Sequence, residues 1–202
     1  MVTARMRERV AELADTRPVL ADSRARIGLF RNVCLKPNQH ECLDAVPGAS
    51  LEGAAEALAK RNGRTVFCTR GEAGILLAEP LREVPGYPVA GPIDPVGAGD
   101  STSAGIICAL AAGATAEQAA AFGNLVASIT VQQLGTTGTA TPDQVRARLA
   151  EVGGRDENRR VGAQLSVALS LPADESKVLS TAFEASQPQP NRVPARRDLQ
   201  GP

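Results

Sequence analysis

Residues 94–105 read DPVGAGDSTSAG and connect a short apolar stretch to a long run of small residues. Gly97, Ala98 and Gly99 come where a predicted strand ends and a predicted helix begins, so several backbone N–H groups gather at the positive end of the helix dipole. An anion is expected to bind there. Asp100 follows on the first turn of the helix, close enough to accept a proton from an attacking hydroxyl group. The alternative interpretation is a tight turn whose acidic residue caps the helix.

Strand-like and helix-like stretches alternate on both sides of this segment. Apolar and β-branched runs predict strands at residues 18–22, 32–36 and 65–69, and a hairpin pair at 74–78 and 81–84. Capping residues and helical spacing predict helices at residues 5–13, 38–45, 51–61, 101–112 and 116–133, and a last one that begins at Thr141. This alternation predicts an α/β architecture, a mostly parallel sheet flanked by helices. Ligands of such sheets bind beyond the carboxyl ends of the strands.

The composition excludes several classes of function. The 202 residues contain 22 Lys and Arg against 22 Asp and Glu, so the chain lacks the excess positive charge that binds nucleic acid or anionic lipid. Only 2% of the residues are aromatic, too few for a base-stacking surface. No apolar run approaches the ~20 residues that cross a bilayer, and the charged start shows no secretory signal. We therefore expect a cytoplasmic protein that binds neither nucleic acid nor membranes.

The cysteines and the single histidine give no sign of a metal site. The four cysteines, Cys34, Cys42, Cys68 and Cys108, include no C-x-x-C pair, and three of the four lie among apolar neighbours. They are expected to be buried free thiols rather than metal ligands. His40 has no partner residues in a pattern typical of a catalytic triad or a zinc site, so it is assigned no role.

The last part of the chain differs in composition from the rest. Residues 153–160 form a polar linker, and residues 186–202 are rich in Pro, Gln and Arg. Such a segment cannot bury enough apolar surface to order itself. We predict a folded portion at residues 1–151 and a mostly disordered extension at residues 152–202.

The segment 94–105 resembles the second signature of the PfkB (ribokinase-like) carbohydrate kinase family, D-[PST]-x-G-A-G-D-x-x-x-[AG]-G, at every specified position. The resemblance implies a ribokinase-like fold. It also implies that Asp100 is the general base that deprotonates the acceptor hydroxyl. The backbone amides of Gly97, Ala98, Gly99 and Asp100 would then form an anion hole for the transferred phosphoryl group. Donors fixed where negative charge develops are what phosphoryl transfer requires, because positioning and electrostatics supply most of its catalysis.

Two upstream segments resemble further motifs of the same family. Asn38 and Glu41 match its N-x-x-E motif, which implies that they help to hold Mg²⁺, water and phosphate; the alternative is an ordinary helix cap. Thr69, Gly71 and Gly74 match its T-x-G-x-x-G nucleotide loop, which implies contact with ATP; the alternative is a turn that connects two strands.

Two downstream segments also have counterparts in the family. Asn124 matches an asparagine near the adenine of ATP, and a helix-packing amide is the alternative. The stretch from Thr130 to Thr139 resembles a loop in which carbonyl groups bind a monovalent cation. The resemblance implies a K⁺ site between this loop and the segment before the anion hole. Its residues would be Asp94, Val96, Thr130, Gly135 and Thr139.

The resemblance covers about residues 10–149, including Asp22 in the family's Asp-x-[Arg or Lys] pattern, and matches the C-terminal half of a ribokinase-like enzyme. It implies transfer of the γ-phosphoryl group of ATP to a hydroxyl of a sugar or sugar phosphate, with Mg²⁺ and K⁺ as cofactors. The family's N-terminal half, with its sugar-binding motif, has no counterpart here. Two hypotheses follow: a truncated kinase, or a nucleotide-binding subunit or remnant without phosphotransferase activity. A second copy or a separate N-terminal half would cover the exposed sheet edge.

Overall fold

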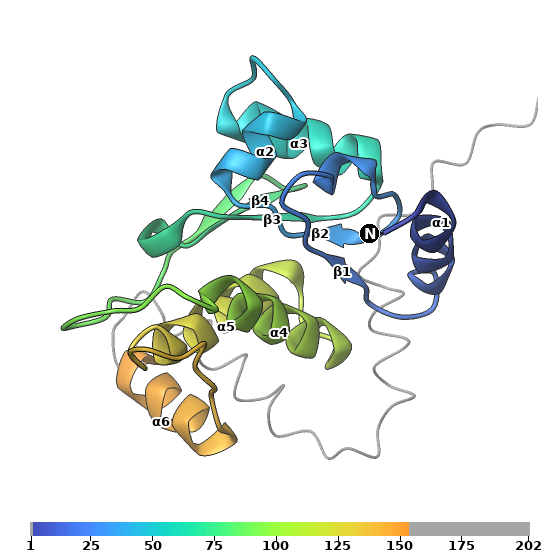
Figure 1. Cartoon of the computed structure of the whole chain (residues 1–202). Helices are drawn as coiled ribbons and strands as arrows, with labels where there is room; N and C mark the ends of the chain where they lie inside the picture. The colour runs from blue at the N-terminus through green and yellow to red at the C-terminus, as the bar shows by residue number, and fades with distance from the viewer. Residues whose placement is uncertain (1, 154–202) are drawn as a thin grey trace, which may run out of the picture.

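The computed structural model describes residues 2–153 (Figure 1). Its helices are α1 (Ala4–Leu13), α2 (Gln39–Ala45), α3 (Leu51–Asn62), α4 (Ala98–Ala111), α5 (Ala116–Thr130) and α6 (Pro142–Gly153), with short 3₁₀ turns at Ile27–Leu29 and Gly71–Ala73. Its strands are β1 (Leu20–Ala21), β2 (Cys34–Leu35), β3 (Val66–Thr69), β4 (Ile75–Ala78) and β5 (Arg82–Val84). Of the extension predicted at residues 152–202, the first two residues belong to α6, and the others lie outside the described residues. Within them, no helix is both long and apolar enough to cross a membrane.

The five strands form one sheet in the order β1-β2-β3-β4-β5. The pairs β1–β2 and β2–β3 are parallel, whereas β3–β4 and β4–β5 are antiparallel. The change between β2–β3 and β3–β4 follows from the connections, because two helices, α2 and α3, link β2 to β3 while only a short turn links β3 to β4. The predicted α/β class is therefore confirmed, and the described sheet is mixed.

Both faces of the sheet are buried. Alternate residues of β3 and β4 point to opposite faces, with Phe67 and Ile75 on the side of α4, α5 and α6, and Val66 and Leu76 on the side of α2 and α3. Figure 1 shows these two helical layers on either side of the strands. The antiparallel strands β3 and β4 thus read as continuous apolar runs because helices cover them on both faces.

Two helix boundaries differ from the sequence prediction. Helix α4 begins at Ala98 rather than near residue 101, because Gly97 adopts a left-handed conformation (φ 80°) and serves as the N-cap. Helix α5 ends at Thr130 rather than at residue 133, because the side chain of Gln133 is bonded to the backbone of Thr139 in the following loop. The earlier start of α4 brings Gly99 and Asp100 into its first turn.

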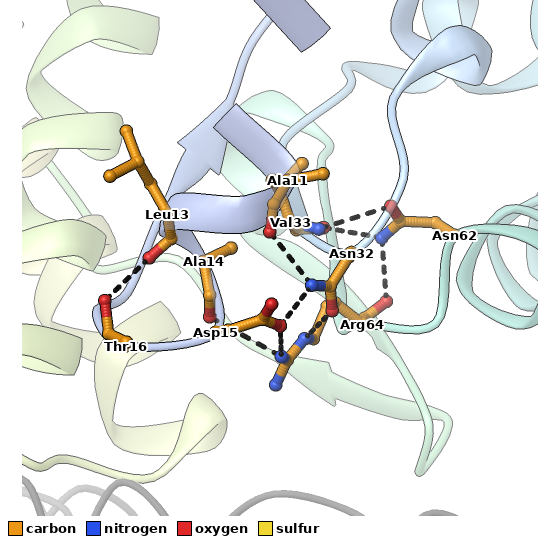
Figure 2. A network of polar contacts seen from close by, with 9 residues as sticks. All are labelled: Ala11, Leu13, Ala14, Asp15, Thr16, Asn32, Val33, Asn62 and Arg64. Carbon is orange, nitrogen blue, oxygen red and sulfur yellow. Dashed lines mark hydrogen bonds and ion pairs between the residues drawn. The ribbon is translucent and has the colours of Figure 1, made fainter. Parts of the chain in front are cut away.

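A polar network attaches α1 to the residues that precede β2 and β3 (Figure 2). The Asn32 side chain donates to the carbonyl of Ala11 at 3.0 Å and to Asp15 Oδ1 at 2.7 Å, and accepts from Arg64 Nε at 2.8 Å. Helix α1 has no buried residue of its own. These hydrogen bonds therefore hold the helix where apolar packing contributes little.

The cysteines are only in part as predicted. Cys42 and Cys68 are buried and Cys34 is partly buried, but Cys108 is exposed on α4, so the prediction of burial is wrong for that residue. Burial of the sulfur raises the pKa of Cys34 to about 11. A hydrogen bond between the thiols of Cys42 and Cys68 lowers the pKa of Cys42 and raises that of Cys68. All four are free thiols.

Close packing of two glycines joins α4 to α5. A Cβ atom at Gly105 would lie 2.8 Å from the Cα atom of Gly123, and a Cβ atom at Gly123 would lie 2.8 Å from Cγ1 of Ile106. Such distances are too short for side chains, so the two backbones approach each other directly. This contact fixes where the amino terminus of α4 lies relative to the sheet.

Gly105→Val is expected to lower the free energy of unfolding by about 1–3 kcal/mol, because the added carbons overlap the backbone of α5. Urea denaturation followed by circular dichroism measures the change. Ala104→Val is the control, since residue 104 is exposed on the same helix. Equal stability of Gly105→Val and Ala104→Val would contradict the close contact of the two helices.

Candidate active site

Four residues in or next to the family motifs lie at the carboxyl ends of the parallel strands: Asp22, Lys36, Asn38 and Thr69. Ala21 pairs with Leu35 across β1 and β2, so the next position on each strand brings Asp22 opposite Lys36. Lys36 Nζ lies 2.7 Å from Asp22 Oδ2. One strand further, Asn38 forms a parallel bridge with Thr69. The strand ends thus form one edge, as expected for the ligand side of a parallel sheet.

The amino terminus of α4 presents free backbone donors. Within residues 2–153 the N–H groups of Gly97, Gly99 and Asp100 have no hydrogen-bond acceptor, whereas the N–H of Ala98 donates to the carbonyl of Pro95 at 3.1 Å. The turn therefore uses one of the four amides that the sequence assigned to an anion hole and leaves three available. They lie at the positive end of a helix of 14 residues.

The Asp100 side chain is available for chemistry. Residue 100 is exposed on the first turn of α4, and in the described part of the chain its carboxylate makes no hydrogen bond or ion pair. An exposed carboxylate next to three free amides can accept a proton while an anion is held beside it. The predicted roles of Asp100, Gly97, Ala98 and Gly99 in the reaction stay predictions.

Lys36, to which no sequence motif assigned a role, lies at the carboxyl end of β2 beside the first turn of α4. Its side chain is 4% exposed, and a Cβ atom at Gly99 would lie 3.6 Å from its Nζ atom. The buried ammonium group thus lies against the first turn of α4. The signal was present in the sequence, because a lysine at the end of an apolar strand, directly before Pro37 and Asn38, is a buried charge that needs a partner.

The N-x-x-E residues form a capping box at the start of α2. Asn38 Oδ1 accepts from the N–H of Glu41 at 2.9 Å, and Glu41 Oε2 accepts from the N–H of Asn38 at 2.9 Å. The capping alternative thus describes real hydrogen bonds. The residues of 2–153 contain no cluster of three or more His, Cys, Asp or Glu side chains that could hold a metal ion. The contribution of Asn38 and Glu41 to a Mg²⁺ site stays a prediction.

The two glycines of the predicted nucleotide loop differ in their surroundings. A Cβ atom at Gly74 would overlap the backbone of Val84, so packing against the end of β5 explains this glycine. A Cβ atom at Gly71 would meet no atom within 4 Å, and the residue has φ +61°. Open space beside Gly71 is compatible with a ligand. The third residue of the motif, Thr69, donates both its N–H and its hydroxyl to the carbonyl of Pro37.

Asn124 connects α5 to the end of β5. Its side-chain nitrogen donates to the carbonyl of Val84 at 3.2 Å and to that of Pro85 at 3.0 Å, and the residue is buried. The helix-packing alternative thus accounts for this amide group. Its contact with adenine stays a prediction.

Asp94 connects the two segments of the predicted cation loop. Its Oδ1 accepts from the N–H of Val96 at 3.0 Å and its Oδ2 from the N–H of Gly135 at 2.9 Å. The Asp94 N–H donates to the carbonyl of Val131 just after Thr130, and the carbonyl of Thr139 accepts from the Gln133 side chain. The predicted residues thus lie around one loop that carries carbonyl and carboxylate oxygens, the kind of ligand that suits a hard cation.

The sequence of this chain is similar to those of known carbohydrate kinases. The profile described as pfkB family carbohydrate kinase matches residues 33–144, more than half of the chain. The bifunctional protein HldE of Stutzerimonas stutzeri is 31% identical over 174 residues, which cover 81% of this chain and 37% of that protein. The ribokinase of Bacillus subtilis is 37% identical over 106 residues, 52% of this chain and 34% of that protein. The chain therefore spans about a third of the length of these curated relatives.

Solved structures with a similar fold include a ribokinase and a phosphofructokinase. Ribokinase of Arabidopsis thaliana complexed with ribose and ATP superposes with a TM-score of 0.58 at 22% identity, covering 71% of this chain and 50% of that one. Phosphofructokinase-2 of Escherichia coli in complex with potassium superposes with a TM-score of 0.60 at 21% identity, covering 73% of this chain and 53% of that one. At this identity the two structures show the fold.

Gly97→Ala is expected to lower the free energy of unfolding by about 1–3 kcal/mol, because residue 97 has φ 80° and its Cβ atom would lie 2.5 Å from the carbonyl oxygen of Thr137. Gly99→Ala is the matched control, since its Cβ atom would be in ordinary contact with Lys36 only. We expect Gly99→Ala to change stability by less than about 1 kcal/mol. Chemical denaturation of both variants measures the difference, and equal stabilities would contradict the left-handed cap.

Proposed function

This chain belongs to the pfkB family of carbohydrate kinases, and we propose that it binds Mg·ATP at the carboxyl ends of β1–β3 and transfers the γ-phosphoryl group to a hydroxyl of a sugar or sugar phosphate. The observation that carries the proposal is the first turn of α4, where three unpaired N–H groups adjoin an exposed carboxylate without a partner among residues 2–153. These are the two components that phosphoryl transfer to an alcohol needs.

In the proposed reaction Asp100 accepts the proton of the acceptor hydroxyl. The hydroxyl oxygen forms a bond to the γ-phosphorus as the bond from that phosphorus to the bridging oxygen of ADP breaks. The amides of Gly97, Gly99 and Asp100 donate to the equatorial oxygens, where negative charge spreads during in-line transfer. Because these donors belong to a helix terminus fixed by Gly97, they need no rearrangement during the reaction.

The remaining predicted residues are proposed to position the nucleotide and its cations. Thr69, Gly71, Gly74 and Asn124 would contact ATP, with Gly71 offering open space for it. Asn38 and Glu41 would hold Mg²⁺ indirectly, and this ion supplies charge that offsets the phosphate oxygens. The loop around Asp94, with Val96, Thr130, Gly135 and Thr139, would hold K⁺.

The acceptor is proposed as a carbohydrate, since the family is described as carbohydrate kinases and a fold neighbour is complexed with ribose and ATP. We propose that the groups that grip it come from a second copy or from a polypeptide equivalent to the part of the relatives that the chain does not match. A nucleotide-binding subunit without its own phosphotransferase activity is the second hypothesis, and the experiment below separates the two.

Asp100→Asn is expected to lower phosphotransfer by roughly 10²-fold or more, the scale of a lost general base, and to leave Mg·ATP affinity nearly unchanged. Calorimetric titration of the 202-residue chain with Mg·ATP measures affinity, and ADP release with sugars and sugar phosphates measures transfer. Asp143→Asn is the control, because Asp143 also lies on the first turn of a helix and its side chain is 94% exposed.

The outcomes separate the hypotheses. Transfer that depends on Asp100 supports the kinase. Mg·ATP binding without transfer to any acceptor supports the nucleotide-binding subunit. Equal activity of Asp100→Asn and the unsubstituted chain would remove Asp100 from the mechanism.

A further inference from the structure

We propose that Lys36 is a direct ligand of the terminal phosphoryl group and that Asp22 is the positioning residue that holds its ammonium group in place. The inference deepens the proposed function and rests on it for the identity of the ligand. No motif of the sequence analysis assigned either residue a role, and the structure brings them together at the sheet edge.

The sheet register determines the direction of both side chains. Leu20 and Cys34 pack toward the α4–α6 layer, and Ala21 and Leu35 pack toward the α2–α3 layer. Alternation along the strands therefore turns Asp22 and Lys36 toward α4. The backbone supports this register, because the N–H of Lys36 donates to the carbonyl of Ala21 at 2.9 Å.

The Lys36 ammonium group has unused donors. It offers three N–H groups, and Asp22 Oδ2, at 2.7 Å, is its only acceptor within residues 2–153. The Lys36 side chain is 4% exposed, so water is largely excluded from it, whereas that of Asp22 is 38% exposed. A buried charge with unused donors is favourable only if a further acceptor binds beside it.

The free donors of Lys36 and α4 converge. The Nζ atom lies 3.6 Å from the position that a Cβ atom at Gly99 would occupy, and the N–H groups of Gly99 and Asp100 lack acceptors in the described part of the chain. An anion seated on these amides would therefore contact the ammonium group. The chemistry that fits is a phosphoryl group, whose several oxygens can accept from the helix terminus and from a lysine at once.

The terminal phosphoryl group is the part of the nucleotide that this contact should recognise. Lys36→Met removes the charge and keeps a similar length, so we expect affinity for Mg·ATP to fall about tenfold or more, the scale of a charged hydrogen bond. Affinity for Mg·ADP should change less than about threefold. Lys36→Arg keeps the charge and should restore part of the difference between the affinities for Mg·ATP and Mg·ADP. Lys60→Met, on the exposed side of α3, should leave both affinities unchanged.

Asp22→Asn tests the positioning role. It leaves Lys36 charged but weakens the partner that orients it, so the ratio of Mg·ATP to Mg·ADP affinity should lie between those of the unsubstituted chain and Lys36→Met. A merely structural ion pair would alter stability in both variants without altering this ratio. A ratio in Asp22→Asn equal to that of the unsubstituted chain would overturn the positioning role.

Inorganic phosphate separates this inference from the proposed function. It should raise the thermal unfolding temperature of the unsubstituted chain and of Asp100→Asn, but not that of Lys36→Met. Circular dichroism of each variant checks that it folds, and Lys36→Gln, which also removes the charge, replaces Lys36→Met if the latter does not. Equal protection of Lys36→Met, or no protection of the unsubstituted chain, overturns the inference. Protection that depends on Lys36 in a chain that transfers no phosphoryl group supports the nucleotide-binding subunit over the kinase and leaves the phosphate ligand in place.

Discussion

The parallel pairing of β1, β2 and β3 sets the geometry of the candidate site. Parallel strands end at one edge, so residues that follow them come together although the first and the last are 47 positions apart in the chain: Asp22, Lys36, Asn38 and Thr69. A slip of one residue between β1 and β2 would turn Lys36 away from α4. The site therefore depends on a register held by only a few backbone hydrogen bonds and by apolar packing on both faces.

The second half of the site is positioned by helix packing. Gly105 and Gly123 allow α4 and α5 to approach directly, and Gly97 lets the chain enter α4 with its first amides free. The polar loop around Asp94 joins the segment before α4 to the segment after α5. The helix terminus is thereby fixed from two sides against the strand ends, which is the preorganisation that electrostatic catalysis requires.

The hydrogen bonds divide the predicted site residues into two groups. Asn38, Glu41, Asp94 and Asn124 already have protein partners that account for their positions. Asp100 and the amides of Gly97 and Gly99 have none within residues 2–153. A folded protein seldom leaves such donors unused unless water or a ligand takes them. The second group is therefore where the chemistry of this chain is expected, and the first group supports it.

Local patterns in the amino-acid sequence were enough to predict the family segment at residues 94–105, the α/β class and the helix caps at Asn38 and Thr141, because a cap or a tight turn depends on residues within three or four positions of each other. Three features could be seen only in the folded chain: the start of α4 at Ala98, the exposure of Cys108, and the contact of Lys36 with Asp22 and the first turn of α4. These features depend on strand register and on contacts between elements distant in the chain, and local periodicity carries no information about either.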